Sequence, residues 1–537
     1  MSHRKPAGPL PVTFTYYTGL ADVPFGNAWL VGTWNVQGLY SEQESSRPME
    51  PVTGEDGCPA FRATVTFAAS EAGKEFRWKV LLDTPGGPNA HAVPTEENDP
   101  QSRHRHRRFV LGEDGPGQEY HLSLQRRLGA NKLWAEGAKE PGIRFSVWAP
   151  NARLVETVLV DRATGYVADD GTGVTGVFPM TRNPEGIWDT DFASSPALRR
   201  FADFVGLPYM FRVTRDDGSV VYRTDLYSRQ QIGRGDVDPH GKPYTGRSRD
   251  LDGRVGASVV VDPDQVRETL AIDEAGETLI PAHDFWAHEF NHLKPLPSRI
   301  EDLVVYQLHV GALGFGRAGP GNLADAVAFI DHLESLGVNA VELLPINEFP
   351  GKVGWGYGTT HFFAIEQSAG GRDHLKHFVR ECHRRGIAVI LDVVYNHYPP
   401  DADRAQWQYD SVQPERNMWY WYEGNAADYP DPNGGYIDNI SSGFAPRFCE
   451  EQVRRCFISS AVSLAAEFHV DGFRMDQVTS LHAYPVVHAN GEAAHHARIF
   501  GTKFLREWNR TLKLVKPPLV THAEDHSLWY LVTLPTT

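Results

Sequence analysis

Cysteine is scarce in this chain of 537 residues, and the four cysteines are Cys58, Cys382, Cys449 and Cys456. None of them shows the C-x-x-C spacing that is typical of a zinc site or a redox pair. Four cysteines in so long a chain do not form a disulfide framework, so we predict free buried thiols.

The sequence also lacks long apolar runs and an excess of positive charge. No stretch is long and apolar enough to predict a membrane span, and residues 1–11 lack the apolar core of a signal peptide. The net charge of −16 argues against nucleic acid or an anionic membrane as partner. We therefore predict a cytoplasmic protein with an uncharged ligand. The one basic run, residues 103–108, is interpreted as a solvated turn rather than an anion site.

The length and composition are typical of a chain with several globular domains, since 41% of the residues are hydrophobic and 22% are charged. Apolar and polar residues alternate up to about residue 112 and again over 140–235, which predicts two β-rich domains. From about residue 300, strands alternate with helices. For example, Asn322 is expected to cap a helix that ends at Gly337. This pattern predicts two β modules in tandem, followed by an incomplete (β/α)8 TIM barrel of which strands 1–5 are recognised.

In such barrels the active residues lie at the carboxyl ends of strands. The fourth strand ends in Arg474 and Asp476, which share a face because they are two residues apart. A neighbouring arginine lowers the pKa of a carboxylate, which suits a nucleophile. The alternative is an ordinary ion pair that closes the strand.

The fifth strand ends in His522 and Glu524, which also share a face. A partly buried glutamate with a raised pKa can act as a general acid. The alternative is that Glu524 or Asp525 caps the following segment.

The third strand ends in Asp392 and Asn396, followed by His397, which could reach a ligand hydroxyl. The Asn396 oxygen suits Ca²⁺, but it is the only such hint. We therefore predict no metal and no cofactor, and leave calcium open. A carboxylate pair on adjacent strand ends is what retaining glycoside hydrolysis requires.

Three ordered segments resemble the first three signatures of the α-amylase superfamily, and residues 355–357 resemble a further family feature. These segments are residues 392–397, 471–476 and 523–525. The resemblance implies that Asp476 is the nucleophile and Glu524 the acid/base. It further implies a substrate-binding set of Tyr357, Asp392, His397, Arg474 and His522, in which Tyr357 stacks on the sugar and Arg474 orients the nucleophile.

The resemblance also implies three domains. Residues 10–115 are similar to starch-binding sandwiches, and residues 138–240 to the sandwich that precedes the barrel in branching and debranching enzymes. Residues 295–537 resemble an amylase-type barrel whose C-terminal part is missing. In the first domain, Trp34 or Trp78 is expected either to contact glucan or to belong to the sandwich core.

The family's third acid, an Asp near the seventh barrel strand, has no counterpart here. We expect a truncated reading frame, a split gene or a fragment. The expected partners are an α-glucan polysaccharide and, as a further candidate, a separate chain that supplies the missing part of the barrel.

The motifs leave the reaction open. Residues 476–481 and 523–525 are similar to 1,4-α-glucan branching enzymes, whereas residues 392–397 look more like amylases, isoamylases and trehalose-releasing hydrolases. The leading hypothesis is double displacement on α-1,4 bonds of glycogen- or starch-like polymers that forms α-1,6 branches. The alternatives are an α-amylase or debranching-type hydrolase, and a glucan-binding protein with a dead barrel. Aromatics in the long segment 395–447 are expected to bind chains: Trp407, Tyr409, Trp419, Tyr420, Trp421 and Tyr422.

Overall fold

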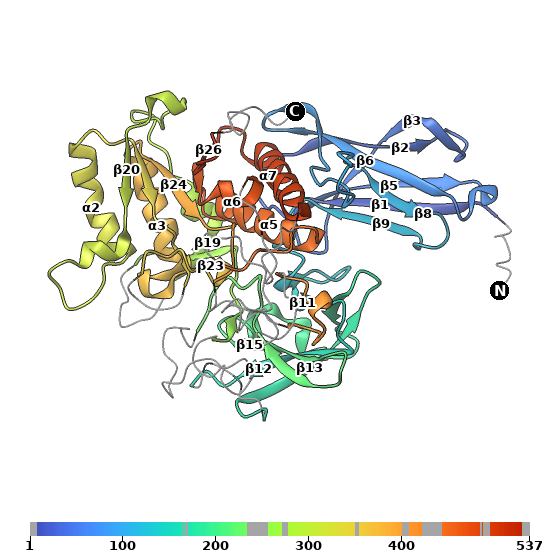
Figure 1. The fold of residues 1–537 in the computed structure, drawn as a ribbon, viewed down its shortest axis with the longest axis horizontal. Helices are drawn as coiled ribbons and strands as arrows, with labels where there is room; N and C mark the ends of the chain where they lie inside the picture. The colour runs from blue at the N-terminus through green and yellow to red at the C-terminus, as the bar shows by residue number, and fades with distance from the viewer. Residues whose placement is uncertain are drawn as a thin grey trace.

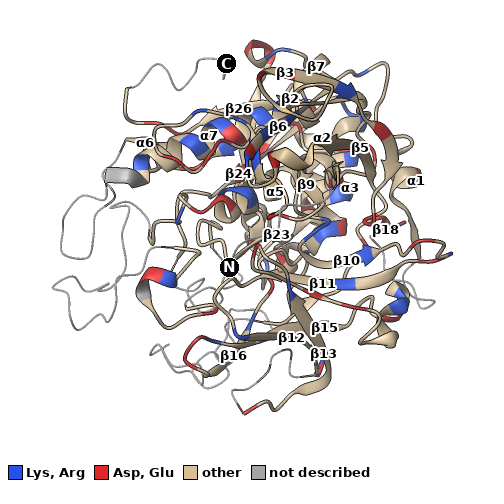
Figure 2. Ribbon diagram, turned by 90° about the vertical axis from the view of Figure 1, so that its right-hand side faces the viewer, with Lys and Arg blue, Asp and Glu red and all other residues tan. Residues whose placement is uncertain are grey.

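A computed structural model describes residues 8–163, 165, 167, 170–232, 256–270, 278–349, 354–399, 408–420, 443–483, 486 and 495–528. The chain forms an N-terminal β-sandwich, a second β-rich unit and a unit of strands and helices, which are blue, cyan to green and yellow to red in Figure 1. Lys, Arg, Asp and Glu are interspersed over these units rather than separated onto opposite sides (Figure 2).

The N-terminal sandwich consists of two sheets. The first has the order β4 (Glu50–Thr53), β5 (Pro59–Phe67), β1 (Leu10–Tyr17) and β9 (Gly117–His121). The second has the order β3 (Tyr40–Pro48), β2 (Gly26–Trp34), β6 (Glu75–Thr84) and β7 (Gly87–His91), with β8 (Arg107–Val110) also paired to β6. Strand β9 pairs in parallel with β1 and therefore belongs to this sandwich. The sandwich thus extends past residue 115, the predicted limit of the first domain.

Trp34 and Trp78 belong to the core of this sandwich, so their interpretation as glucan contacts is wrong. They are 3% and 1% exposed. Their rings lie 5.5 and 5.2 Å from the ring of Phe14, between the two sheets. Alternation along a strand identifies one face, but only the second sheet decides that this face is the interior.

The second β-rich unit is one extended antiparallel sheet. Its order is β10 (Gly129–Leu133), β11 (Gly142–Trp148), β14 (Ile187–Thr190), β13 (Val174–Arg182), β12 (Leu154–Val160), β15 (Pro208–Thr214) and β16 (Val220–Arg223), with β17 (Ser258–Val259) also paired to β15. It therefore extends on both sides of the predicted range 138–240. A short hairpin of β18 (Gln265–Arg267) and β19 (Leu279–Pro281) follows, then helix α1 (Ala282–Trp286).

The third unit contains a five-stranded parallel sheet, which matches the five predicted strands. The order is β20 (Val305–Leu308), β21 (Ala340–Leu343), β24 (Ala388–Val393), β25 (Gly472–Met475) and β26 (Val520–Ala523). Strands β21 and β24 are fully buried, whereas residues in the outer strands β20 and β26 are exposed or half-buried, apart from Leu308. That this sheet is part of an eight-stranded barrel stays a prediction. A two-stranded ribbon of β22 (Asn347–Glu348) and β23 (His361–Ile365) accompanies it.

Helices connect the parallel strands: α2 (Leu323–Ser335), α3 (Gly371–Arg384), α5 (Glu451–Glu467), α6 (Val478–His482) and α7 (His495–Val515). Asn322 caps α2 as predicted, because its side chain accepts from the amides of Ala324 and Asp325, and Asp325 accepts in return from the Asn322 amide. Gly337 follows the helix with φ of 75°. In the described part of the chain, no helix is long and apolar enough to cross a bilayer.

Three of the predicted chain-binding aromatics are buried, and two of these, Tyr409 and Trp419, join two domains instead. Tyr409, Trp419 and Tyr420 are at most 3% exposed. The Tyr409 hydroxyl donates to the carbonyl of Thr224 at 3.1 Å, and the Trp419 ring meets Trp148 edge-on at 5.6 Å. The Tyr420 ring stacks on Phe444 at 5.7 Å within the third unit. The prediction that they bind glucan is wrong for these three, because their side chains are buried. Trp407, Trp421 and Tyr422 lie outside the described residues.

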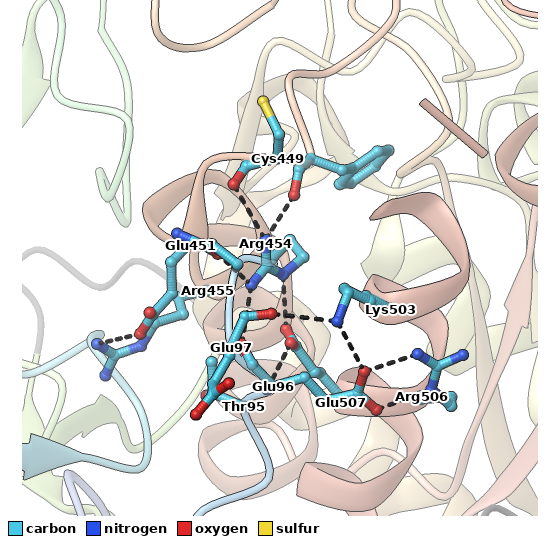
Figure 3. Close-up of polar contacts among 12 residues, drawn as sticks. Thr95, Glu96, Glu97, Cys449, Glu451, Arg454, Arg455, Lys503, Arg506 and Glu507 are labelled. Atoms are coloured by element: carbon cyan, nitrogen blue, oxygen red, sulfur yellow. Dashed lines mark hydrogen bonds and ion pairs between the residues drawn. The ribbon is translucent and has the colours of Figure 1, made fainter. Parts of the chain in front are cut away.

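The basic run 103–108 is not simply a solvated turn. The Arg107 guanidinium donates to the Glu451 carboxylate on α5 at 2.8 and 3.0 Å. Beside it, the buried Glu96 binds cations of α7, and Figure 3 shows this junction. Ion pairs therefore attach the N-terminal sandwich to helices α5 and α7 of the third unit.

The cysteine prediction is confirmed. All four cysteines are free thiols, and Cys58, Cys382 and Cys456 are buried, while Cys449 is half-buried.

Candidate active site

The predicted site residues gather at the carboxyl ends of three neighbouring strands. The strand register places Asp392 of β24 opposite Arg474 of β25, and Arg474 opposite His522 of β26. Asp476 and Glu524 lie directly after the ends of β25 and β26. Because the strands are parallel, all these ends meet at one edge of the sheet.

Arg474 is the centre of the site because it contacts three carboxylates. Its Nη1 donates to Asp392 Oδ2 at 2.7 Å and to Asp476 Oδ1 at 2.9 Å, and its Nη2 lies 2.8 Å from Glu524 Oε2. One guanidinium thus holds the two predicted catalytic carboxylates together. The alternative of a lone ion pair that closes the strand does not describe this arrangement.

Asn396 positions Asp476, a role that the sequence did not reveal. Its Nδ2 donates to Asp476 Oδ2 at 2.8 Å and to the Asp476 carbonyl at 3.0 Å. Its Oδ1 accepts from His397 Nδ1 at 2.7 Å. The shared strand face of Asp392 and Asn396 was the available signal, but it suggested a calcium ligand. Among the described residues, no group of three or more His, Cys, Asp or Glu side chains could hold a metal ion.

Glu524 is held by the backbone as well as by Arg474. The amide of Gln477 donates to Glu524 Oε2 at 2.9 Å. Gln477 adopts a left-handed conformation with φ of 45°, which is uncommon for a residue other than glycine and aims its amide at the carboxylate. Gln477 therefore belongs to the site, although no side-chain pattern indicated it.

The pKa values of the two predicted catalytic carboxylates are shifted opposite to expectation. Burial raises the pKa of Asp476 despite the bonds from Asn396 and Arg474, and the nearby charge of Glu524 adds to this rise. Burial opposes the ionisation of Glu524 too, but the Gln477 amide and Arg474 outweigh it, so its pKa is lowered. In the free chain these opposite shifts favour a proton on Asp476 over one on Glu524.

Asp392 is the most buried acid of the group. Burial raises its pKa to about 7, although Arg474 and the Tyr357 hydroxyl oppose the shift. Both partners bind the same oxygen, Oδ2, and the buried Oδ1 has no hydrogen-bond partner among the described residues. Among the described residues, Oδ1 therefore has no donor that would favour the ionised form.

Of the other predicted binding residues, Tyr357 and His397 contact this cluster, whereas His522 lies beside it. The Tyr357 hydroxyl donates to Asp392 at 2.8 Å, and its ring centroid lies 5.9 Å from the Arg474 guanidinium. His397 is 4% exposed and is joined to the cluster through Asn396 and through the backbone of Tyr357. His522 lies 3.9 Å from Glu342, which accepts from Gln307, so it belongs to a separate pair beside the cluster.

A stability measurement tests the protonation of Asp392. Because its pKa is higher in the folded chain, the folded state binds more protons than the unfolded state between about pH 4 and 7, so this contribution is lost as pH rises. We expect the advantage of the unchanged chain over Asp392→Asn to fall by up to about 1.4 kcal/mol per pH unit across that window. Urea unfolding at pH 5, 6, 7 and 8 measures it.

Asp189→Asn is the control for this experiment. Arg127 and Arg144 hold the pKa of the half-buried Asp189 below the ordinary value against the effect of burial, so it adds no slope between pH 4 and 7. A pH-independent difference between the unchanged chain and Asp392→Asn would show that Asp392 is ionised throughout.

Comparison with known families agrees with this geometry. Residues 309–528 match the model described as alpha amylase, catalytic domain. Residues 127–228, which contain most of the second β-rich unit, match carbohydrate-binding module 48, the isoamylase N-terminal domain. The amylase-type match includes all seven predicted site residues.

The relatives of this chain carry different names. A 1,4-alpha-glucan branching enzyme GlgB 1 of Streptomyces coelicolor is 30% identical over 78% of this chain and 46% of its own length. A malto-oligosyltrehalose trehalohydrolase of Arthrobacter ramosus is 33% identical over 44% of this chain and 37% of its own length. The catalytic module of the pneumococcal glycogen-degrading virulence factor SpuA shares the fold with a TM-score of 0.50, at 19% identity over 74% of this chain and 51% of that one. The chain thus spans about half the length of the branching enzyme.

Proposed function

We propose that this chain acts on α-1,4-glucosidic bonds of glycogen- or starch-like polymers and forms α-1,6 branches by double displacement. The observation that carries this proposal is the position of Asp476 and Glu524 at the ends of adjacent parallel strands, both bound to Arg474. Retaining glycosidic chemistry needs one carboxylate as nucleophile and a second as acid and base.

In the first step, the Asp476 carboxylate attacks the anomeric carbon while Glu524 gives its proton to the departing glycosidic oxygen. The α-1,4 bond breaks and a covalent glycosyl-enzyme forms. In the second step, Glu524 removes the proton from a glucan 6-hydroxyl, whose oxygen displaces Asp476. Asn396 and Arg474 hold the two Asp476 oxygens during the attack.

The first step requires a proton on Glu524, whereas the pKa shifts in the free chain favour a proton on Asp476. We infer that glucan binding transfers it. A sugar oxygen placed between Glu524 and Arg474 weakens the 2.8 Å ion pair that keeps Glu524 ionised. With Arg474 then left to Asp392 and Asp476, the proton is favoured on Glu524.

Branching is preferred over hydrolysis because several relatives that align with most of this chain bear the name 1,4-alpha-glucan branching enzyme. A hydrolase is the second candidate, since the Arthrobacter relative named as a trehalohydrolase has a somewhat higher identity over a shorter stretch. Branching and hydrolysis proceed through the same covalent intermediate. They differ in whether a sugar hydroxyl or water displaces Asp476 from it.

We propose in addition that further strands pair with the outer edges of β20 and β26. Among the described residues these two strands each have one neighbour, and Val304 and Val305 are 52% and 41% exposed. Strands paired to both edges would cover this apolar surface and the unpaired backbone groups. A separate chain and a continuation of the same chain would serve equally.

Incubation of the 537-residue chain with amylose tests the proposal, with quantification of α-1,6 linkages and reducing ends. Growth of α-1,6 linkages without a matching net release of reducing ends supports branching. Reducing ends alone would replace branching by hydrolysis. Glucan binding without either product would favour the catalytically dead binding protein.

A further inference from the structure

A cavity of about 30 Å³ lies away from the candidate active site, where the three units meet. Gln125 and Arg126 line it from the connection between the two β-rich units, and Lys376 of α3 and Glu467 of α5 line it from the catalytic domain. The exposed Ala21 and Asp22 also line it, so it reaches the surface. A space of this size holds one or two waters, or one ion of similar size, but not a sugar.

Cations crowd around a single carboxylate beside this cavity. The Glu467 oxygens lie 3.6, 3.7 and 3.7 Å from guanidinium nitrogens of Arg126, Arg229 and Arg372. Charge-assisted hydrogen bonds are about 2.7–2.9 Å long, so none of these three contacts is one. Both Glu467 oxygens are buried and have no hydrogen-bond partner among the described residues. The three guanidinium groups therefore surround the Glu467 carboxylate at distances too long for hydrogen bonds.

Lys376 is the least satisfied member of the cluster. Its side chain is fully buried, and its Nζ has no hydrogen-bond partner in the described part of the chain. The ammonium lies over the ring of Phe468, whose centroid is 5.6 Å away. Burial and then the charge of Arg372 lower the pKa of Lys376 to about 7. A buried ammonium without a partner is costly, which indicates a missing counterion.

The surrounding acids do not neutralise the cluster. Asp262 and Asp264 bind Lys132, and Asp264 also binds Arg126 at 2.8 Å. Asp373 lies 3.7 Å from Arg372 and is shared with Arg267. Asp22 also lines the cavity. These described residues are then six cations and five acids, and Glu467 is left beside both Arg229 and Lys376, so one positive charge is in excess.

We propose that this cavity binds one small monovalent inorganic anion, of the size of chloride, between Lys376 and Arg126. The anion would supply the acceptor that Lys376 lacks and neutralise the excess charge. Because the cluster joins α3 and α5 to the connection ahead of the second β-rich unit, the anion would hold three parts of the chain together. The inference does not depend on the proposed branching activity.

Thermal unfolding of the 537-residue chain tests the proposal at pH 6.5 and constant ionic strength. We expect replacement of gluconate by chloride to raise the Tm by about 2–4 °C with saturation, because a ligand of the folded state stabilises it by mass action. Crystals soaked in bromide should show an anomalous peak beside Lys376. An unchanged Tm, together with no such peak, would mean that the cavity holds only water.

Lys376→Met and Lys503→Met form a matched pair of variants. Lys376→Met removes the unpartnered charge, so it should fold at least as stably in gluconate and lose the chloride response. Lys503 is equally buried, but it is paired with Glu96 at 3.3 Å and bonded to backbone carbonyls. Lys503→Met should therefore lower the Tm and keep the response. A chloride response that persists in Lys376→Met would overturn the proposal.

Discussion

Replacement of Asp476 by Asn is expected to lower glucan turnover by at least about 10³- to 10⁵-fold, because the amide cannot form the glycosyl-enzyme. Asn396 and Arg474 hold the two Asp476 oxygens, so the side chain has a fixed place in the site. The change keeps the size of the side chain, so glucan binding should change little, while the unfolding midpoint should fall modestly because the new NH2 group faces one of the two donors. Product formation from amylose and retention on an amylose affinity gel measure the two properties separately.

Azide distinguishes a nucleophile from a residue that only positions others. In Asp476→Ala, azide can enter the vacated space and attack the anomeric carbon, so a glycosyl azide should accumulate and partly restore bond cleavage. Asn396→Ala is the matched control, because it disturbs the position of Asp476 but leaves the nucleophile in place. Its activity should fall less and should not respond to azide. Turnover by Asp476→Asn near that of the unchanged chain would contradict the assignment.

Glu96→Gln is expected to cost about 3–5 kcal/mol of folding free energy, because it leaves buried cations without their counterion. The Glu96 carboxylate is fully buried and lies 3.3 and 2.6 Å from Lys503 and Arg506 of α7 (Figure 3). Arg510 of the same helix lies 2.7 Å from it. These cations hold the pKa of Glu96 at about 2 against the effect of burial. Urea unfolding at pH 7 measures the loss.

Glu97→Gln is the control for this prediction. Glu97 is the next residue and pairs with Arg108, which is 41% exposed, so its removal should cost less than about 1 kcal/mol. Because α7 leads directly into β26, Glu96→Gln should also reduce turnover through a displaced Glu524. Equal stability of the two variants would show that water already screens the Glu96 cluster.

Local features of this protein were predictable from the sequence. Asn322 and Gly337 mark the ends of α2 because a helix cap depends on residues within one turn. The five parallel strands were recognisable because continuous apolar runs alternate with helical stripes. Since such strands all point one way, the strand pattern by itself places Asp392, Arg474, Asp476 and Glu524 at one edge of the sheet.

Only the tertiary structure decided how those groups interact. A single Arg474 serves three carboxylates, and burial acts on each to a different degree, so the pKa of Asp476 rises while that of Glu524 falls. His522 shares a strand face with Glu524 yet lies beside Glu342 from another strand. Trp34, Trp78 and Tyr409 are buried because a second sheet or domain covers them. Electrostatic energy and burial depend on distances through space between residues remote in the chain, whereas caps and strand periodicity depend on neighbours along it.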